Sequence, residues 1–298
     1  MSFEVWLSAA RPRTLPAAVS PVLVGTAAAE RFSTWRMVAA MVVALAVQVA
    51  VNYANDYFDG VRGVDTVERR GPQRVVAAGL VSPDSMRTAM IAALGVAALA
   101  GLALAAAVGW QLVLVGALCF AAALAYSGGP RPYASAGFGE LSVFVFFGLV
   151  ATVGSAYVQD EQLRWLPVVA AIPVGLLSVA LLVVNNLRDI PTDEQVGKRT
   201  LAVRLGARAT FDLYLATVNV AMLFTGVVAL VARSVWPALG FVALPLALMA
   251  QRRTAAGMRA DDPAQLIGAL AVTGRLQLVY GMLLAGGLAL ASVAPGSL

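Results

Sequence analysis

Long apolar stretches without Asp, Glu, Lys or Arg recur along nearly the whole chain. They cover residues 14–29, 37–55, 88–130, 141–159, 165–187, 213–232, 234–251 and 276–298. A helix that crosses a membrane needs about 20 mostly apolar residues, and the stretch 88–130 is about twice that long. Gly109 and Trp110 provide a hinge near its middle. The pattern therefore predicts an all-α protein with nine transmembrane helices, which we expect to form a single domain over residues 1–298.

Two of the nine predicted helices contain prolines. Pro16 and Pro21 lie in the first helix, and Pro237 and Pro245 lie in the eighth. Proline lacks a backbone N–H and kinks or ends a helix. We therefore expect these two helices to be the least regular of the set.

The positions of lysine and arginine predict the orientation in the membrane. Nine helices place the two ends of the chain on opposite sides. If the N-terminus lies inside, 17 of the 21 Lys and Arg residues fall on the inner side, which is the bias that the positive-inside rule describes. We therefore predict a multi-pass protein of the cytoplasmic (inner) cell membrane with a cytoplasmic N-terminus. The formal net charge of +5 is then a topology signal, and we expect no nucleic-acid partner.

The composition excludes several classes of enzyme and metal site. Sixty per cent of the residues are apolar and only 12% are charged, whereas soluble domains carry about 25% charged residues. The chain has no histidine, which excludes Ser-His-Asp hydrolases and His-ligated metals. With Cys119 as the single cysteine, an intrachain disulfide and a thiolate zinc site are excluded as well. Carboxylates, Arg, Tyr, Asn, Gln and the single Lys198 remain for polar chemistry.

The acidic residues gather on the predicted inner side. Of 16 Asp and Glu residues, only Glu30, Asp160 and Glu161 fall outside. Asp and Glu contribute little to topology, so the bias indicates a function on the inner face. Two inner loops, 56–87 and 188–212, are long, and each begins with carboxylates at the inner end of an apolar helix.

The spacing of these acidic residues predicts a site for divalent cations. Asn52, Asp56 and Asp59 follow one another at i+4 and i+3, so they share one face of a helix. Asp189 and Asp193 are also four residues apart, with Pro191 between them, where we expect the helix to end. Clustered carboxylates near a bilayer are costly but become favourable around Mg²⁺, which takes hard oxygen ligands and substrate phosphates. The two similar clusters suggest related halves that face each other across a central cavity.

Basic residues surround both acidic clusters. Guanidinium groups suit phosphate oxygens, so the combination predicts a diphosphate held at the mouth of an apolar cavity, as in a prenyl diphosphate. These basic residues are Arg62, Arg69, Arg70, Arg74, Arg188, Lys198 and Arg199.

Simpler interpretations stay open for each feature alone. The Asp residues could be helix caps or solvated loop residues, and an arginine run often anchors lipid headgroups. Tyr126 and Tyr133 also suit a belt of aromatic residues at the membrane interface. Glu140 lies at the inner end of a predicted span, where an acidic side chain is costly and usually serves a function. A transporter with acidic ion sites is the rival class, although its site would lie near the midplane. Two matching clusters on one face favour an enzyme.

At these residues the chain resembles the intramembrane aromatic prenyltransferases of the UbiA superfamily, which have nine transmembrane helices and two Asp-rich motifs. NYANDYFDGVRGVD (52–65) resembles the first motif; its last acidic position falls on Gly63, and Asp65 is the nearest substitute. NNLRDIPTD (185–193) and GKRTLAVRLG (197–206) resemble the second. ARPRTLP (10–16) and YSGGPRPY (126–133) resemble further inner-face segments of the branch that acts on 1,4-dihydroxy-2-naphthoate.

The resemblance implies a Mg²⁺-dependent transfer from polyprenyl diphosphate to 1,4-dihydroxy-2-naphthoate in contact with membrane lipids, with loss of diphosphate and CO₂. Another acceptor, such as 4-hydroxybenzoate or homogentisate, is the alternative, and oligomeric state and chain length stay open. The expected metal ligands are Asn52, Asp56, Asp59, Asp189 and Asp193, and Lys198 joins the four aspartates as a catalytic residue. The expected substrate-binding residues are Asn52, Asp65, Arg70, Arg74, Arg188, Arg199, Arg13, Arg131, Tyr126, Tyr133 and Glu140.

Overall fold

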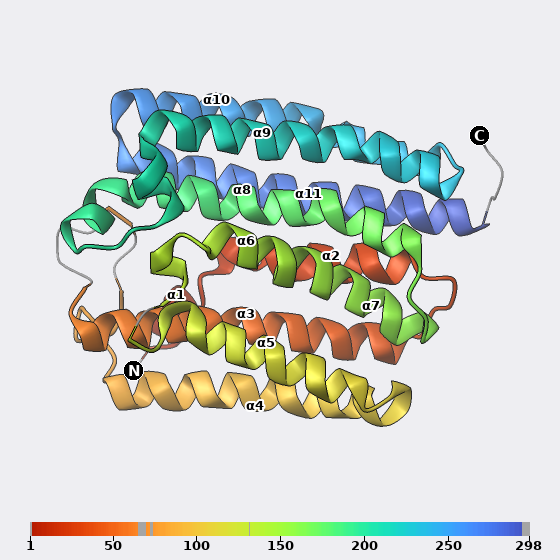
Figure 1. Ribbon diagram of the computed structural model, residues 1–298, viewed down its shortest axis with the longest axis horizontal. Helices are drawn as coiled ribbons and strands as arrows, with labels where there is room; N and C mark the ends of the chain where they lie inside the picture. Colours follow the sequence, from red (N-terminus) through yellow and green to blue (C-terminus); the bar gives the residue numbers. More distant parts are fainter. Residues whose placement is uncertain (1, 65–69, 72–73, 131, 294–298) are drawn as a thin grey trace.

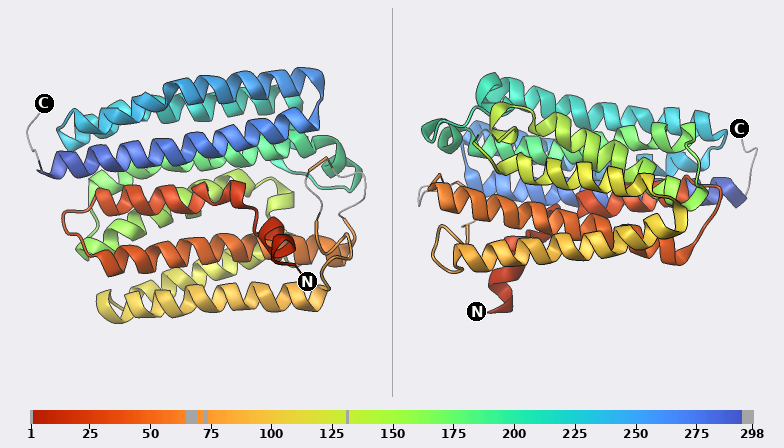
Figure 2. Two further views of the ribbon diagram at one scale, coloured as in Figure 1. Left: turned by 180° about the vertical axis from the view of Figure 1, so that it is seen from behind. Right: turned by 60° about the horizontal axis from the view of Figure 1, so that its bottom comes forward.

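The computed structural model describes residues 2–64, 70–71, 74–130 and 132–293. All regular secondary structure in these ranges is helical, as predicted. The main elements are α1 (Phe3–Ala10), α2 (Pro16–Ala27), α3 (Thr34–Arg62), α4 (Pro83–Val108), α5 (Gln111–Ser127), α6 (Gly139–Val143), η3 (Phe144–Val150), α7 (Ala151–Asp160), α8 (Trp165–Gln195), α9 (Leu201–Ala232), η4 (Trp236–Ala243), α10 (Leu244–Ala260) and α11 (Pro263–Val293). Figures 1 and 2 show the long helices side by side, with connections at two opposite ends of the bundle.

Within the described residues, six helical segments are long and apolar enough to cross a membrane. They are α3, α4, the α6–η3–α7 segment, α8, α9 and α11. The helices α2 and α5 are apolar but shorter. The hinge predicted inside 88–130 is present, because α4 ends at Val108 and α5 begins at Gln111. The protein is therefore a multi-pass helical membrane protein.

One of the two proline-containing stretches is irregular, as predicted, and the other is not, because α2 runs unbroken from Pro16 to Ala27 with Pro21 inside it. The stretch that contains Pro237 forms the 3-10 segment η4 before α10 begins. The expected end of a helix at Pro191 was wrong, because α8 continues to Gln195. Proline removes only one intrahelical N–H, and the Thr192 hydroxyl donates to the carbonyl of Asp189 at 3.0 Å within the same turn. Asp193 therefore stays on the helix that carries Asp189.

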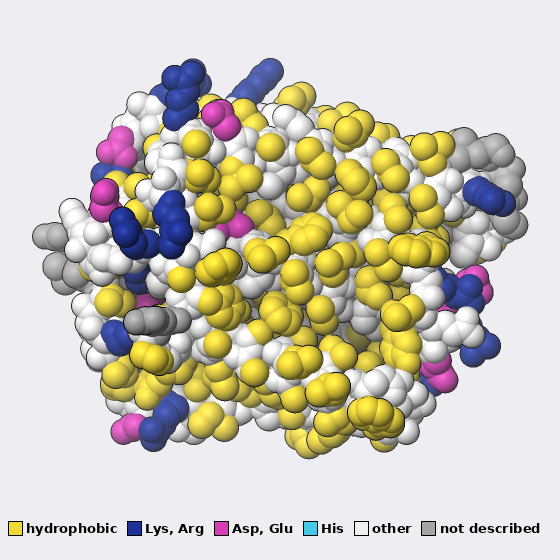
Figure 3. All heavy atoms as spheres, viewed as in Figure 1, with side chains coloured by type: hydrophobic (Ala, Val, Ile, Leu, Met, Phe, Trp, Pro, Cys, Tyr) yellow, Lys and Arg dark blue, Asp and Glu magenta, His cyan; other side chains and the backbone are white. Residues whose placement is uncertain are grey.

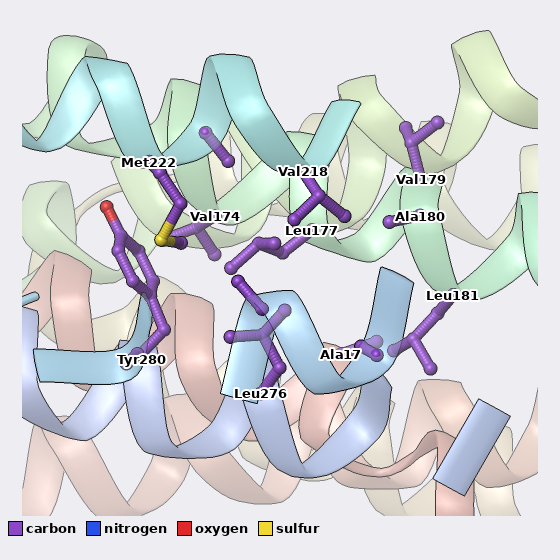
Figure 4. Close-up of a cluster of buried hydrophobic side chains, with 14 of the residues drawn as sticks. Ala17, Val174, Leu177, Val179, Ala180, Leu181, Val218, Met222, Leu276 and Tyr280 are labelled. Atoms are coloured by element: carbon purple, nitrogen blue, oxygen red, sulfur yellow. The ribbon is translucent and has the colours of Figure 1, made fainter. Parts of the chain in front are cut away.

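The core lies between α8, α9, α11 and α2. In the most apolar part of α8, 72% of the residues are buried, compared with 39% or less in the other five candidate spans. Figure 4 shows Leu177 of α8, Val218 and Met222 of α9, and Leu276 and Tyr280 of α11 pointing toward one another. The Tyr280 hydroxyl pairs with Thr225 at 2.9 Å, which satisfies its polar group in an apolar setting. This core holds α8 in place against the rest of the bundle.

The face of the molecule shown in Figure 3 is mostly apolar in the middle, and charged side chains gather toward its two ends. Leu99 of α4, Leu118 of α5 and Leu223 of α9 are 72%, 60% and 70% exposed. A large exposed apolar surface marks a membrane or partner interface. Its position between two charged ends fits lipid contact.

Replacing Gly148 with alanine is expected to destabilise the bundle by about 1–3 kcal/mol, because overpacking forces backbone shifts. Gly148 lies in the π-helical segment η3, and a Cβ there would come within 2.6 Å of the Cα of Gly175 on α8. Thermal unfolding in detergent measures the loss. Gly95→Ala is the matched control, because a Cβ at Gly95 meets no described atom within 4 Å. Equal melting temperatures for the two variants would contradict this packing argument.

Candidate active site

A cavity of about 850 Å³ lies between α2, α3, α4, α5, η3 and α8. Its lining along α3 runs from Ala40 to Asp59, which is about 28 Å of helix at 1.5 Å per residue. Its polar lining is concentrated near the carboxyl-terminal ends of α3 and α8, which lie at the same end of the bundle (left in Figure 1). These polar residues include Asn52, Asn55, Asp56, Asp59, Arg74, Asn185, Asn186, Arg188, Asp189, Asp193 and Lys198. The rest of the lining is mostly apolar.

The first acidic cluster lies on one buried face of α3, as its spacing predicts. Asn52, Asp56 and Asp59 are all at most 6% exposed. The amide of Asn52 donates to the carbonyl of Ala10 at 2.8 Å and to the Thr14 hydroxyl at 3.2 Å. These bonds tie the chain before α2 to the wall of the cavity.

Asp56 and Asp59 have different partners. Asp56 accepts the backbone N–H groups of Val75 and Val76 at 3.2 and 3.0 Å, so it anchors the chain that leads to α4. Asp59 is surrounded by cations. Its oxygens lie 3.0 Å from Lys198 Nζ, 3.0 Å from Arg62 Nη2 and 3.6 Å from Arg74 Nη2.

The second acidic cluster lies at the end of α8. Arg188 is 2% exposed and donates to both oxygens of Asp189 at 2.7 Å and to Asn185 Oδ1 at 2.9 Å. Asp193 lines the cavity one turn later, and its carbonyl accepts the backbone N–H of Lys198 at 2.8 Å. The turn after α8 therefore directs Lys198 toward Asp59 on α3, which joins the two acidic clusters by an ion pair.

Some of the remaining predicted site residues line the cavity, and others lie outside it. Arg13 is exposed and lines the cavity, as do Tyr126 and Tyr133, whose rings meet edge to face with centroids 5.5 Å apart. The side chain of Arg199 is exposed outside the cavity lining. Glu140 lies behind the wall, bonded to Asn186. Asp65, Arg69 and Arg131 lie outside the described residues.

Arg70 does not join the cavity. Its guanidinium forms a two-point ion pair with Asp261, on the connection between α10 and α11, with Nη2 3.0 Å from Oδ2. The hydrogen bond from Arg70 lowers the pKa of the Asp261 carboxyl below its ordinary value. Because a lowered pKa keeps the carboxylate ionised, any stabilisation from the pair persists at neutral pH and is lost only as the pH falls through that pKa. An exposed pair of this kind contributes little to stability.

The oxygen donors suit Mg²⁺ shared with a phosphate substrate. Among the described residues, no three acidic side chains converge on one point. An ion here would therefore be held by one or two carboxylates, with substrate oxygens and water in its other positions. Mg²⁺ commonly adopts this arrangement with phosphates. The chemistry of Asp56, Asp59, Asp189 and Asp193 thus fits the expected metal.

The sequence prediction missed Asn185 and Asn186 as parts of the site. Both line the cavity, and they precede Asp189 by four and three residues. That spacing places them on the same side of α8 as Asp189. Applying the helical periodicity to the second motif, as was done for the first, would have identified them.

The fold and the site together define a membrane-embedded prenyltransferase: the chain belongs to the UbiA prenyltransferase family, which matches residues 18–273. It is 47% identical to the 1,4-dihydroxy-2-naphthoate octaprenyltransferase of Mycobacterium leprae over 97% of this chain and 98% of that one. It is 31% identical to the enzyme of the same name from Bacillus subtilis over 93% and 90% of the two chains.

Two solved structures share the fold. A UbiA homolog from Archaeoglobus fulgidus bound to GPP and Mg²⁺ has a TM-score of 0.63 and 16% identity, with 94% of this chain and 99% of that one covered. The apo structure of a UbiA homolog from Aeropyrum pernix has a TM-score of 0.65 and 16% identity, with 90% and 94% covered. These likenesses establish the helical architecture alone.

Proposed function

We infer that this protein transfers a polyprenyl group from polyprenyl diphosphate to 1,4-dihydroxy-2-naphthoate and releases diphosphate. The observation that carries the inference is the joined pair of acidic clusters at the polar end of an apolar cavity. It occurs in a chain 47% identical to a relative named for this reaction over nearly its full length. The polar end suits the diphosphate, and the apolar lining suits the prenyl chain.

The polar end of the cavity is built to hold a leaving diphosphate. Lys198 and Arg74 line the cavity and meet at Asp59, so they are in place to contact phosphate oxygens before the substrate arrives. Preorganised charges of this kind stabilise negative charge as it develops in the transition state. Asp56, Asp59, Asp189 and Asp193, assisted by Asn52, would hold Mg²⁺. Bound Mg²⁺ supplies positive charge that polarises the diphosphate and neutralises it as it leaves.

The reaction breaks the allylic C–O bond, and both electrons leave with the diphosphate. The apolar lining excludes water from the allylic cation. We propose that the ring attacks through the carbon that bears its carboxylate, so that the C–C bond forms with a ring electron pair. The bond to the carboxylate then returns its electrons to the ring as CO₂ leaves, which gives the prenylated 1,4-dihydroxynaphthalene, demethylmenaquinol; its oxidation to demethylmenaquinone is a separate two-electron step. No base is needed at that carbon. Arg13, or Arg131 outside the described residues, is the proposed contact for the carboxylate.

We also propose the finer topology that the charge distribution supports. The chain would form one domain with nine transmembrane helices, in which α2, α5 and the η4–α10 segment would be counted with the six longer ones. The 17 inner Lys and Arg residues favour a cytoplasmic N-terminus and an active site that faces the cytoplasm. A bacterial cytoplasmic membrane is the proposed location.

Chelation of divalent cations is expected to abolish the activity of the purified enzyme. With 1,4-dihydroxy-2-naphthoate and a long polyprenyl diphosphate, EDTA should lower turnover to background and excess Mg²⁺ should restore it, because the clustered carboxylates need divalent charge between them. Mass spectrometry of the lipid-soluble product measures turnover and reveals whether CO₂ was lost. Activity that persists in EDTA would contradict the metal assignment. Uptake of the diphosphate into proteoliposomes without any prenylated product would favour a transporter.

A further inference from the structure

A buried carboxylate lies behind the cavity wall where α6 meets α8. Glu140, in the first turn of α6, is 8% exposed. Its Oε1 accepts the side-chain amide of Asn186 at 2.9 Å, and its Oε2 has no hydrogen-bond partner among the described residues. Acidic side chains at membrane depth are costly and usually serve a function. The pair with Asn186 indicates what that function is.

The bond to Glu140 determines which way the Asn186 amide points. The side-chain nitrogen of Asn186 donates to Glu140 Oε1, so this bond fixes the nitrogen end of the amide toward Glu140. Its oxygen, Oδ1, is then directed away from Glu140, and no group in the described part of the chain donates to it. Because Asn186 lines the cavity, the wall offers one oriented hydrogen-bond acceptor to a bound molecule.

The position of this acceptor suits the aromatic substrate. Asn186 precedes Asp189 by three residues, so it lies about 4.5 Å along α8 from the proposed diphosphate site, toward the middle of the membrane. Tyr126 approaches from α5, and its hydroxyl lies 3.6 Å from where a Cβ would sit on Gly139, next to Glu140. Tyr126 and Tyr133 provide an aromatic surface beside the polar end of the cavity.

The chemistry of Asn186 Oδ1 discriminates among the bound groups. An ionised diphosphate offers acceptors and no donor, and a prenyl chain offers neither. A phenolic hydroxyl donates a hydrogen bond. Among the proposed substrates, only the hydroxylated ring can therefore satisfy this oxygen.

We propose that Asn186 binds a hydroxyl group of the aromatic acceptor through Oδ1, and that Glu140 is the positioning residue that orients Asn186. The inference rests on the proposed function, because it assigns a recognition role within the same site. It predicts that acceptor selection depends on a pair of residues on α6 and α8 that hold no part of the diphosphate.

Asn186→Leu and Glu140→Gln test the proposal with the full-length enzyme in detergent. Asn186→Leu is expected to raise the KM for 1,4-dihydroxy-2-naphthoate about tenfold, the cost of one lost hydrogen bond at the upper end of the usual range. Glu140→Gln is expected to raise it about threefold, because glutamine accepts either orientation of the Asn186 amide. The KM for polyprenyl diphosphate should change less than about twofold in both variants, since the diphosphate does not use this acceptor. Asn219→Leu, which removes an exposed amide bonded to Gln251 on the far helices, is the matched control and should change neither value.

Competitive inhibition by acceptor analogues identifies the hydroxyl. The wild type should bind one of the two monohydroxy-2-naphthoates about tenfold more weakly than the other, and Asn186→Leu should remove that preference. If the wild type makes product but both variants keep the wild-type acceptor KM and analogue preference, this inference is overturned and the proposed function stands. If the wild type prenylates no hydroxylated aromatic acceptor, both fail. Should Asn186→Leu not fold, Asn186→Ser and Glu140→Gln decide the question by the same measurements.

Discussion

Replacing Asp59 with asparagine is expected to lower kcat/KM for prenyl transfer by about 100- to 1,000-fold, the usual cost of removing one preorganised electrostatic group. Asp59 is buried and contacts Lys198, Arg62 and Arg74. Asparagine keeps the size of the side chain but removes the negative charge. The loss would remove a proposed metal ligand and release the cations from the geometry in which they meet the diphosphate.

The measurement is turnover of purified variants with saturating Mg²⁺, read by mass of the prenylated product. Asp84→Asn is the matched control, because Asp84 lies in the first turn of α4, its side chain is 86% exposed, and its carboxylate pairs only with nearby Arg87 among the described residues. It should retain wild-type activity. Thermal unfolding of both variants separates lost chemistry from lost structure. A folded Asp59→Asn protein with wild-type kcat/KM would refute the role given to the joined acidic clusters.

Replacing Arg188 with leucine is expected to destabilise the protein by about 3–5 kcal/mol, because it leaves the buried carboxylate of Asp189 without its ion-pair partner. Arg188 and Asp189 have side chains that are 2% and 8% exposed, and they form two hydrogen bonds of 2.7 Å. Without the guanidinium, the Asp189 carboxylate stays in the cavity wall without its main counter-charge. The double variant Arg188→Leu/Asp189→Asn should recover much of the stability, since it no longer holds the unmatched charge.

Thermal unfolding in one detergent compares the single variants Arg188→Leu and Asp189→Asn with the double variant. The exposed pair of Arg87 and Asp84, with side chains 53% and 86% exposed, provides the control. Arg87→Leu should shift stability by less than about 1 kcal/mol, because solvent screens such pairs. If the double variant is less stable than Arg188→Leu alone, the buried pair is not the source of the effect.

Much of the helical fold could be predicted because it depends on local patterns. Uninterrupted apolar stretches have few alternatives to helices in a membrane, where every backbone polar group must be satisfied within the segment. The shared face of Asn52, Asp56 and Asp59 follows in the same way from 3.6 residues per turn. Pro191 was misjudged because a propensity rule was applied without the surrounding helix, which absorbs the loss of one hydrogen bond.

The sequence predicted most of the residues that form the site. It did not predict the ion pairs and hydrogen bonds between them. No local rule relates Lys198 to Asp59, which are 139 residues apart and 3.0 Å from one another. Arg70 was expected over the cavity but pairs with Asp261, 191 residues away. Glu140 reaches Asn186 only because η3 and α6 pack against α8. Each of these contacts depends on how helices distant in sequence are packed together.

The sequence by itself determined which segments are helices, which of their faces carry carboxylates and which chemistry those carboxylates favour, because hydrophobicity and helical periodicity act between near neighbours. Only the tertiary structure decided which cation meets which carboxylate, and which asparagine presents an oxygen to the cavity. Those choices depend on distances through space and on burial, which raise the cost of any polar group left unpaired.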